Sequence, residues 1–379
     1  MSAILPGATL GMLGSGQLGR MFAIEARRLG YRVHVFSPDS DTPAGEVANA
    51  SWIAEYDDED SLKEFANTVD VVSLEFENID VQALHVLEQY VPVRPGPLTL
   101  HTAQHRAREK TALRNMGLAT APFHLVHSAD ELSRAQQELG EGILKTAAWG
   151  YDGKGQQRLS PQADAKSVWQ NFGTDEAVFE GLVKFRCEFS VIGVRTEAGD
   201  MQLYGAVENA HANHILDVSL APAPSVPESA VQRAQEMTRV VMEKLDTVGV
   251  LCIEFFLDEH DEPIINEIAP RPHNSGHLTI DAHYVCQFEQ QVRAICGLPL
   301  GTTQQRQPAA MVNLLGDLWP VHGQPNWVAA LSNPLVKLHL YGKQDARPGR
   351  KMGHLTALGD SVAAAETTAQ SARQSLLER

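Results

Sequence analysis

The sequence has few cysteines, a shortage of basic residues and no long apolar run. Its four cysteines (Cys187, Cys252, Cys286 and Cys296) form no C-x-x-C pair in 379 residues. This argues against a disulfide framework or a structural zinc site and fits a reducing compartment. No apolar run approaches the roughly 20 residues that a membrane span needs, and the first residues lack the order typical of a signal peptide. We therefore expect a soluble, cytoplasmic protein.

Basic residues are outnumbered by acidic ones. The chain has 31 Lys and Arg against 47 Asp and Glu, which gives a net charge of −16. An acidic surface repels polyanions, which excludes nucleic acids and anionic membranes as general partners. The charge is uneven. Residues 39–80 carry a net −12, typical of a solvated face, and residues 337–354 carry a net +4 among glycines and a proline. The length predicts two or three domains.

Strands and helices are expected to alternate as far as residue 103, which predicts a parallel sheet with right-handed crossovers. Strands are predicted at 9–13, 32–36, 69–76 and 91–93, with helices after Gly19 and at 81–90. Beyond Pro95-Gly-Pro97 we expect helices at 104–116, from Ser128 and at 228–245. Strands are expected at 142–146, 177–180, 186–195 and 202–208, and a hairpin at 250–268. Short strands and turns follow to residue 354, and the tail after 362 is biased towards Ala, Gln and Ser.

The first motif that suggests chemistry is Gly14-x-Gly16-x-x-Gly19, between a predicted strand and a predicted helix. Glycines allow backbone N–H groups to approach a phosphate at the positive end of a helix. Asp39 lies 20 residues after Gly19, where a dinucleotide site places its ribose-binding acid. The pattern therefore suggests a nicotinamide oxidoreductase, but it does not distinguish a dinucleotide from a sugar monophosphate, and a simple tight turn is the alternative.

A second glycine-rich loop follows the predicted strand that carries Lys145. It reads Gly150-Tyr151-Asp152-Gly153-Lys154-Gly155-Gln156. A loop of this kind is able to wrap phosphates, and Lys145 would reach the same anion. It differs from a P-loop, and a plain hairpin turn is the alternative interpretation.

Two carboxylates are expected to face each other in the predicted hairpin. If Leu257 pairs with Ile264, then Glu254 pairs with Glu267 on the same face. Two opposed and buried carboxylates repel each other. A divalent cation between them, completed by nucleotide phosphates, would remove that repulsion and is typical of Mg²⁺. The alternative is that one of the two side chains points to solvent.

The segment after this hairpin concentrates hydrogen-bond donors between prolines and a glycine. It contains Arg271, His273 and Asn274 within Arg271-Pro-His-Asn-Ser-Gly-His277. A rigid loop with such donors suits a small oxyanion, although a purely structural loop would look similar.

Taken together, these segments resemble the ATP-grasp carboxylate–amine ligases, and more closely the family of 5-(carboxyamino)imidazole ribonucleotide synthases. The resemblance extends to about His354 and rests on the motifs above together with Gly-Gln-Leu-Gly-Arg-Met (16–21), Glu75-Phe-Glu77-Asn, Arg106 with Glu109-Lys110, and Arg347-Pro-Gly-Arg-Lys-Met-Gly-His354. It implies a mixed α/β and α+β fold: a Rossmann-like domain (1–103), a two-lobed ATP-grasp domain (104–300) and a β-rich C-terminal domain (301–379). It also implies a homodimer.

The resemblance implies a role for each matching residue. The ATP site would comprise Arg106, Lys145, Gly150–Gln156, Glu180, Gly181, Leu182, Val183, Glu188, His211, Asn266 and Glu267. Glu254 and Glu267 would hold Mg²⁺ or Mn²⁺, and Asn266 is the candidate for the metal-binding Asn that many relatives carry at the position of Ala269. Arg271, His273, Asn274 and Lys145 would be catalytic towards bicarbonate and its carboxyphosphate. Aminoimidazole ribonucleotide would contact Gln17, Leu18, Glu75, Tyr151, Asp152, Lys343, Arg350 and Lys351.

Three alternative functions stay open at the level of sequence. A formate-using glycinamide ribonucleotide transformylase shares the fold, the ATP and the metal, but His-Asn-Ser-Gly-His at 273–277 favours bicarbonate. A nicotinamide oxidoreductase leaves the paired glutamates and the second glycine loop without a role. A non-catalytic nucleotide sensor would bind ATP without turnover.

Overall fold

The computed structural model describes residues 2–148 and 155–378. Its N-terminal part is a four-stranded parallel sheet in the order β3-β2-β1-β4. The elements are β1 (Thr9–Leu13), α1 (Gln17–Arg28), β2 (Arg32–Ser37), β3 (Ala50–Ile53), α2 (Glu59–Ala66), β4 (Val71–Leu74), α3 (Val81–Leu87) and α4 (Pro97–Ala103). The predicted alternation is confirmed. Residues 91–93, predicted as a strand, form a single bridge from Val93 to Val72, and β3 is an edge strand that the sequence does not predict.

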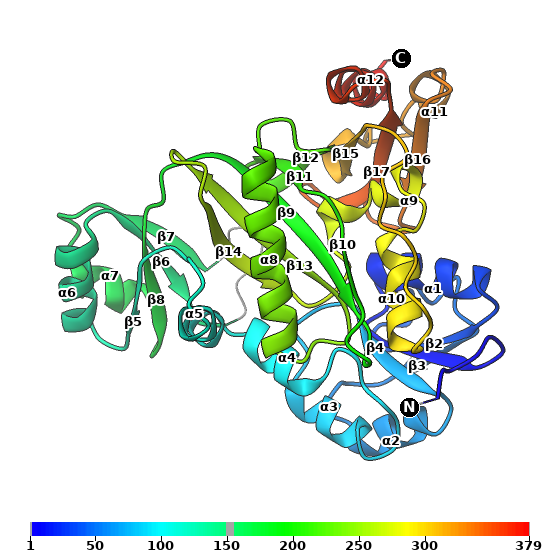
Figure 1. Cartoon of the computed structure of the whole chain (residues 1–379), viewed down its shortest axis with the longest axis horizontal. Helices are drawn as coiled ribbons and strands as arrows, with labels where there is room; N and C mark the ends of the chain where they lie inside the picture. Colours follow the sequence, from blue (N-terminus) through cyan, green and yellow to red (C-terminus); the bar gives the residue numbers. More distant parts are fainter. Residues whose placement is uncertain (1, 149–154, 379) are drawn as a thin grey trace.

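A small lobe follows, and it stands apart from the rest of the molecule at the left of Figure 1. Its antiparallel sheet has the order β5-β8-β6-β7. The elements are α5 (Arg106–Asn115), β5 (Phe123–Val126), α6 (Ala129–Leu139), β6 (Gly142–Thr146), β7 (Gln156–Leu159), α7 (Ala165–Phe172) and β8 (Ala177–Gly181). Ser128 begins α6 as predicted, because its hydroxyl accepts a hydrogen bond from the Glu131 N–H at 3.2 Å.

A long antiparallel sheet joins the rest of the chain in the order β14-β13-β9-β11-β12-β15-β17-β16, with β10 paired to β9. The strands are β9 (Phe185–Arg195), β10 (Met201–Leu203), β11 (Val207–Ala212), β12 (Ile215–Ala221), β13 (Gly249–Asp258), β14 (Pro263–Ala269), β15 (Ala309–Leu315), β16 (Val336–Leu340) and β17 (Lys351–Leu358). The strand predicted at 202–208 is in fact divided between β10 and β11. The C-terminal strands continue the central sheet through the pairing of β12 with β15.

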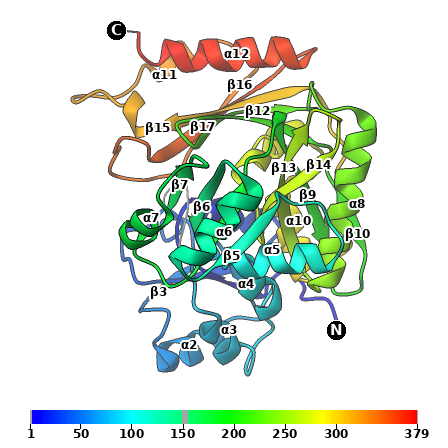
Figure 2. The same ribbon diagram turned by 90° about the vertical axis from the view of Figure 1, so that its left-hand side faces the viewer.

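Helices cover this sheet on both faces. They are α8 (Glu228–Lys244), α9 (Thr279–Ala282), α10 (Gln287–Ile295), α11 (Trp327–Ala330) and α12 (Val362–Ser375). Helix α12 forms from the biased tail and lies across β15 and β17, where Ala365, Ala369 and Ala372 are buried (Figure 2). In the described part of the chain, every helix is too short or too polar to cross a lipid bilayer.

Alternation along β13 determines where Glu254 lies. Leu251 and Ile253 pack on the side of α8, whereas Val250 and Cys252 pack on the other side with Ala294 of α10. Successive side chains of a strand point to opposite faces. Glu254 therefore shares the face of Cys252, which is the face covered by the loop that follows β14.

Candidate active site

One cleft of about 700 Å³ receives side chains from the N-terminal part, the small lobe, the central sheet and the C-terminal hairpin, which is formed by β16, β17 and the residues between them. Sixteen of the predicted site residues line it: Gln17, Leu18, Glu75, Arg106, Lys145, Gln156, Glu188, His211, Glu254, Asn266, Glu267, Arg271, His273, Asn274, Lys343 and Lys351. Glu180, Gly181, Leu182, Val183 and Gly155 do not line it. Arg350 lines an adjoining cavity of about 270 Å³. The predicted contacts from Gly150 to Lys154, including Tyr151 and Asp152, lie outside the described residues.

The two predicted metal-binding glutamates do pair across the hairpin, but the register that led to them is wrong. Glu254 lies opposite Glu267, whereas Leu257 lies opposite Pro263 rather than Ile264. The difference is a β-bulge in which Asn266 is the extra residue of β14. A bulge redirects side chains, and here both Asn266 and Glu267 line the cleft.

The paired glutamates differ in charge environment. Burial, and then the nearby Glu254, raise the pKa of Glu267. Although burial opposes it, His273 lowers the pKa of Glu254 to about 2, with its Nε2 at 3.0 Å from Oε1 of the glutamate. The repulsion that Glu267 experiences is what a bound cation would relieve.

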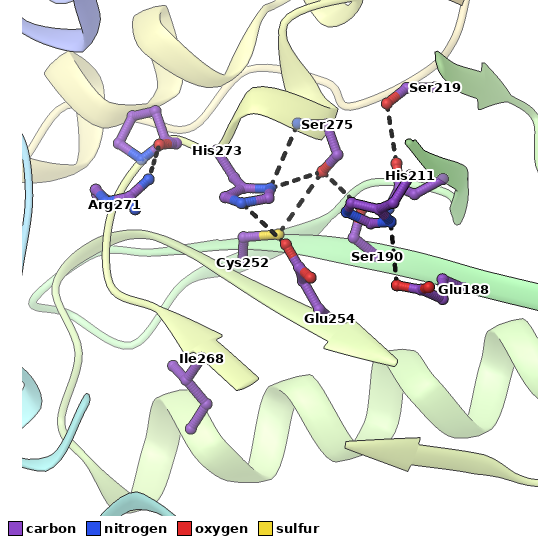
Figure 3. Close-up of polar contacts among 12 residues, drawn as sticks. Glu188, Ser190, His211, Ser219, Cys252, Glu254, Ile268, Arg271, His273 and Ser275 are labelled. Carbon is purple, nitrogen blue, oxygen red and sulfur yellow. Dashed lines mark hydrogen bonds and ion pairs between the residues drawn. The ribbon is translucent and has the colours of Figure 1, made fainter. Parts of the chain in front are cut away.

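A chain of hydrogen bonds that ends at Ser275 holds the imidazole of His273 in place (Figure 3). The Ser219 hydroxyl donates to Asn209 Oδ1 (2.9 Å), and the Asn209 amide donates to Ser190 Oγ (3.1 Å). Ser190 Oγ lies 2.7 Å from Ser275 Oγ, which in turn lies 3.0 Å from His273 Nδ1. Because every link is buried or half-buried, the ring has one well-defined orientation towards Glu254.

Arg271 and Asn274 present polar groups to the cleft in different ways. The Arg271 guanidinium forms a bidentate ion pair with the Glu77 carboxylate. Its Nε donates to Oε2 at 2.6 Å and its Nη2 donates to Oε1 at 3.0 Å. The Asn274 side chain is 7% exposed, and its Oδ1 and Nδ2 have no hydrogen-bond partner within the described residues. A buried amide without partners is costly unless a ligand supplies them, so this loop is suited to a small polar ligand.

The glycines after β1 surround the protein's own carboxylate. Glu75 Oε2 accepts hydrogen bonds from the Gly16 N–H at 2.6 Å and the Gly19 N–H at 3.2 Å. A Cβ added to Gly16 would lie 2.1 Å from Glu75 Oε1, so this close approach requires glycine. Despite these hydrogen bonds, burial raises the pKa of Glu75 to about 7. The donors that a dinucleotide pyrophosphate would use are therefore occupied, which removes the main support for an oxidoreductase.

Glu180 is the anchor of Lys145 rather than part of the cleft wall. Its Oε2 accepts a hydrogen bond from Lys145 Nζ at 2.8 Å and lies 3.6 Å from Lys110 Nζ. Although burial acts in the opposite direction, these two cations lower the pKa of Glu180 to about 2. The pair keeps the Lys145 ammonium at the edge of the cleft.

This lowered pKa gives a testable dependence of stability on pH. Glu180 stabilises the fold above its ordinary pKa of 4.5, and the contribution is lost as the pH falls from 4.5 towards 2. The substitution Glu180→Gln deprives Lys110 and Lys145 of their shared carboxylate and should cost roughly 3 kcal/mol at neutral pH. We expect the Tm difference between wild type and variant, followed by circular dichroism, to narrow steadily below pH 4.5. A difference that stays constant down to pH 3 would contradict this.

Two further clusters complete the cleft. His211 Nδ1 lies 3.1 Å from Glu188 Oε2, and although burial acts in the opposite direction, this carboxylate raises the pKa of His211. In the second cluster, Lys343 Nζ donates to Gln17 Oε1 at 2.5 Å and to the Lys351 carbonyl at 2.7 Å. Lys343 thus ties the C-terminal hairpin to the N-terminal glycine loop.

Several cleft residues have no site role in the sequence prediction, although some belong to its motifs. They include Phe76, Glu77, Asn78, Gln104, Glu109, Ile143, Phe185, His214 and Phe256. Glu77 lies two residues after the predicted Glu75, and this spacing is a signal in the sequence that Glu77 shares its side of the chain. Phe185 of β9 and Phe256 of β13 stack with their ring centroids 4.6 Å apart. Only the register of the two strands reveals this apolar contact.

The donor set fits a magnesium ion that is completed by a ligand. Within residues 2–148 and 155–378, no three His, Cys, Asp or Glu side chains are grouped to hold a metal by themselves. Mg²⁺ usually binds one or two carboxylates plus substrate phosphates. The opposed pair Glu254 and Glu267, with the Asn266 amide beside it, provides that number of oxygen ligands.

Family models match three consecutive segments of the chain. A ribonucleotide synthetase preATP-grasp domain matches residues 7–104, an ATP-grasp domain matches 111–288, and a phosphoribosylaminoimidazole carboxylase C-terminal domain matches 309–368. The chain is 41% identical over 355 residues to the N5-carboxyaminoimidazole ribonucleotide synthase of Bacillus subtilis, covering 93% of this chain and 92% of that protein. The Brucella melitensis enzyme of the same name is also 41% identical, over 94% of this chain and 98% of its own length.

Solved structures agree with these matches. The ADP complex of an N5-carboxyaminoimidazole ribonucleotide synthetase superposes with a TM-score of 0.91 at 39% identity, covering 100% of this chain and 99% of the other. The Aspergillus clavatus N5-carboxyaminoimidazole synthase, in complex with ADP and 5-aminoimidazole ribonucleotide, gives 0.87 at 31% identity over 97% and 98% of the two chains.

Proposed function

The chain belongs to the family of N5-carboxyaminoimidazole ribonucleotide synthases, and we propose on that basis that its cleft joins bicarbonate to the amine of 5-aminoimidazole ribonucleotide at the expense of ATP. The enzyme is an ATP-grasp ligase of purine biosynthesis. One observation supports the assignment most directly. Lys145, the opposed glutamates, Arg271, Asn274 and Lys343 all line a single cleft.

Two chemical steps follow from this arrangement. A bicarbonate oxygen attacks the γ-phosphorus of ATP, so a new P–O bond forms while the bond to ADP breaks. The amine nitrogen then attacks the carbon of the resulting carboxyphosphate, the C–O bond to phosphate breaks, and the amine proton is released. Mg²⁺, when bound, would neutralise charge on the phosphates during the first step.

The protein's own residues position the partners and compensate charge. Lys145, held by Glu180, would contact the nucleotide phosphates with Arg106, and Glu188 and His211 would face the ribose. Arg271 and Asn274 would hold bicarbonate, with His273 fixed beside them by Ser275. The ribonucleotide would lie between Glu75 and the cationic hairpin, where its phosphate meets Lys343 and Lys351 and, in the adjoining cavity, Arg350.

The choice of substrates is tested by phosphate release from ATP with two substrate pairs. We expect turnover with 5-aminoimidazole ribonucleotide plus bicarbonate, and none with glycinamide ribonucleotide plus formate. Turnover with the second pair alone would establish the transformylase instead. ATP binding without turnover in either mixture would favour a nucleotide sensor. We also propose that the enzyme works in the cytoplasm as a homodimer, which sedimentation of the purified protein tests.

Lys343 provides a specific test of the ribonucleotide end of the cleft. Replacing it with methionine removes a charge-assisted contact to the substrate phosphate and should raise the KM for the ribonucleotide by about 10- to 100-fold. The KM for ATP should not change. Lys337→Met, an exposed lysine of the neighbouring strand β16, is the matched control. Equal KM values for the ribonucleotide in the two variants would place its phosphate elsewhere.

A further inference from the structure

The bulge in β14 changes which edge of the strand its backbone groups face. The Ile265 N–H donates to the Ala119 carbonyl, and the Ile268 N–H donates to Glu109 Oε1 at 2.5 Å, both on the side away from β13. In an unbroken strand, residues 265 and 268 would face opposite edges, because backbone groups alternate. One extra residue between them, Asn266, accounts for this change.

Two successive residues of α5 bind the backbone on either side of Glu267. Glu109 accepts from the N–H of Ile268, the residue after Glu267. Lys110 donates to the carbonyl of Asn266, the residue before it, at 2.8 Å. Both side chains are buried, at 3% and 0% exposure. The backbone that carries Glu267 is therefore held from both sides by hydrogen bonds to buried polar side chains of one helix.

Lys110 also connects this strand to the small lobe. Its Nζ lies 3.6 Å from Glu180 Oε2, and the same carboxylate oxygen binds Lys145 Nζ at 2.8 Å. Lys110 thus links the strand that carries Glu267 to the lobe that carries Lys145. A fully buried ammonium is costly to desolvate unless its partners are well placed, and here they are a backbone carbonyl and a carboxylate.

We propose that Glu109 and Lys110 are positioning residues that hold the β14 bulge in place, so that Asn266 and Glu267 both face the bound nucleotide and metal. The inference rests on the proposed function for what occupies the cleft. It adds a role for two residues that would act through the backbone of β14. Without these partners, the Ile268 N–H and the Asn266 carbonyl would lose their hydrogen bonds, and Glu267 would no longer have a fixed place opposite Glu254.

Two substitutions of Glu109 separate this role from direct contact with the ligand. Glu109→Gln keeps an oxygen that accepts from the Ile268 N–H, whereas Glu109→Met keeps the volume and loses the acceptor. Mn²⁺ binding in the presence of ADP, measured by calorimetry, should be close to wild type for the glutamine variant. For the methionine variant it should be about 10- to 100-fold weaker. Hydrogen exchange of the peptide 263–269 should speed up in the methionine variant only.

Three results would overturn the proposal. If both variants bind Mn²⁺ and ADP like wild type, the hydrogen bond to Ile268 has no positioning role. If the glutamine variant is as damaged as the methionine variant, Glu109 acts through its charge on the ligand itself. If Lys110→Met leaves both Mn²⁺ binding and the exchange of 263–269 unchanged, the second contact has no such role. The wild-type measurement is separate. A wild-type protein that fails to bind ADP would count against the proposed function and not against the positioning of β14.

Discussion

Replacing Glu267 with glutamine should slow phosphate release from ATP by about 10²- to 10³-fold while leaving the metal-free protein at least as stable as wild type. Glu267 lies opposite Glu254, and both burial and that neighbour raise its pKa. A neutral amide removes the repulsion between the two side chains, which favours the fold. If the pair binds Mg²⁺ as proposed, the same change removes one of its two carboxylate ligands, which disfavours the first chemical step.

The two effects have opposite signs, and this makes the test informative. Activity is measured as phosphate release at saturating substrates, and stability as the Tm in the presence of a chelator. Glu262→Gln is the control, because Glu262 belongs to the turn of the same hairpin and is 57% exposed at its side chain. A Glu267→Gln protein that loses stability and activity together would show that Glu267 is a structural residue. Full activity in that variant would exclude it as a metal ligand.

Replacing Arg271 with methionine should abolish most of the turnover, by about 10²-fold or more, and destabilise the protein by about 2 kcal/mol. The catalytic loss follows if Arg271 binds bicarbonate. The loss of stability arises because Glu77 keeps its charge in the cleft without the guanidinium fork that now compensates it. Breaking a fully buried ion pair costs about 3–5 kcal/mol. Here the cost is smaller, because the two side chains are 18% and 29% exposed.

The double variant Arg271→Met with Glu77→Met separates these two effects. The double variant has no uncompensated Glu77 carboxylate in the cleft. Its free energy of unfolding should therefore return towards the wild-type value. Turnover should stay low, because the bicarbonate contact is still missing. If the double variant regains activity along with stability, Arg271 is needed only to neutralise Glu77. If the single variant is already as active as wild type, bicarbonate binds elsewhere.

Residues close together in the sequence explain why so much of the cleft was predictable. The pairing of Glu254 with Glu267 follows from a short hairpin, and Arg271, His273 and Asn274 directly follow its second strand. The register was wrong at Leu257 because one extra residue, Asn266, shifts all pairs beyond it. An alternating pattern does not show a bulge, since Ile264, Ile265 and Ile268 are apolar on either side of it.

Contacts between segments that are far apart in the chain could not be predicted from the sequence. Glu77 and Arg271 are 194 residues apart, and Lys343 and Gln17 are 326 residues apart. The charge of the acidic stretch 39–80 predicts a solvated face apart from Glu75, but Glu77 also lines the cleft. Helix α12 was within reach of sequence analysis, because Ala365, Ala369 and Ala372 recur at helical spacing.

The central claim is that bicarbonate oxygen attacks the γ-phosphate of ATP in this cleft. It is tested most directly with bicarbonate labelled with ¹⁸O on all three oxygens, in the presence of ATP and 5-aminoimidazole ribonucleotide. The attacking oxygen stays on phosphorus when the C–O bond of carboxyphosphate breaks, so mass spectrometry should find one labelled oxygen in each phosphate released. Phosphate that carries no label while the ribonucleotide is carboxylated would contradict the account.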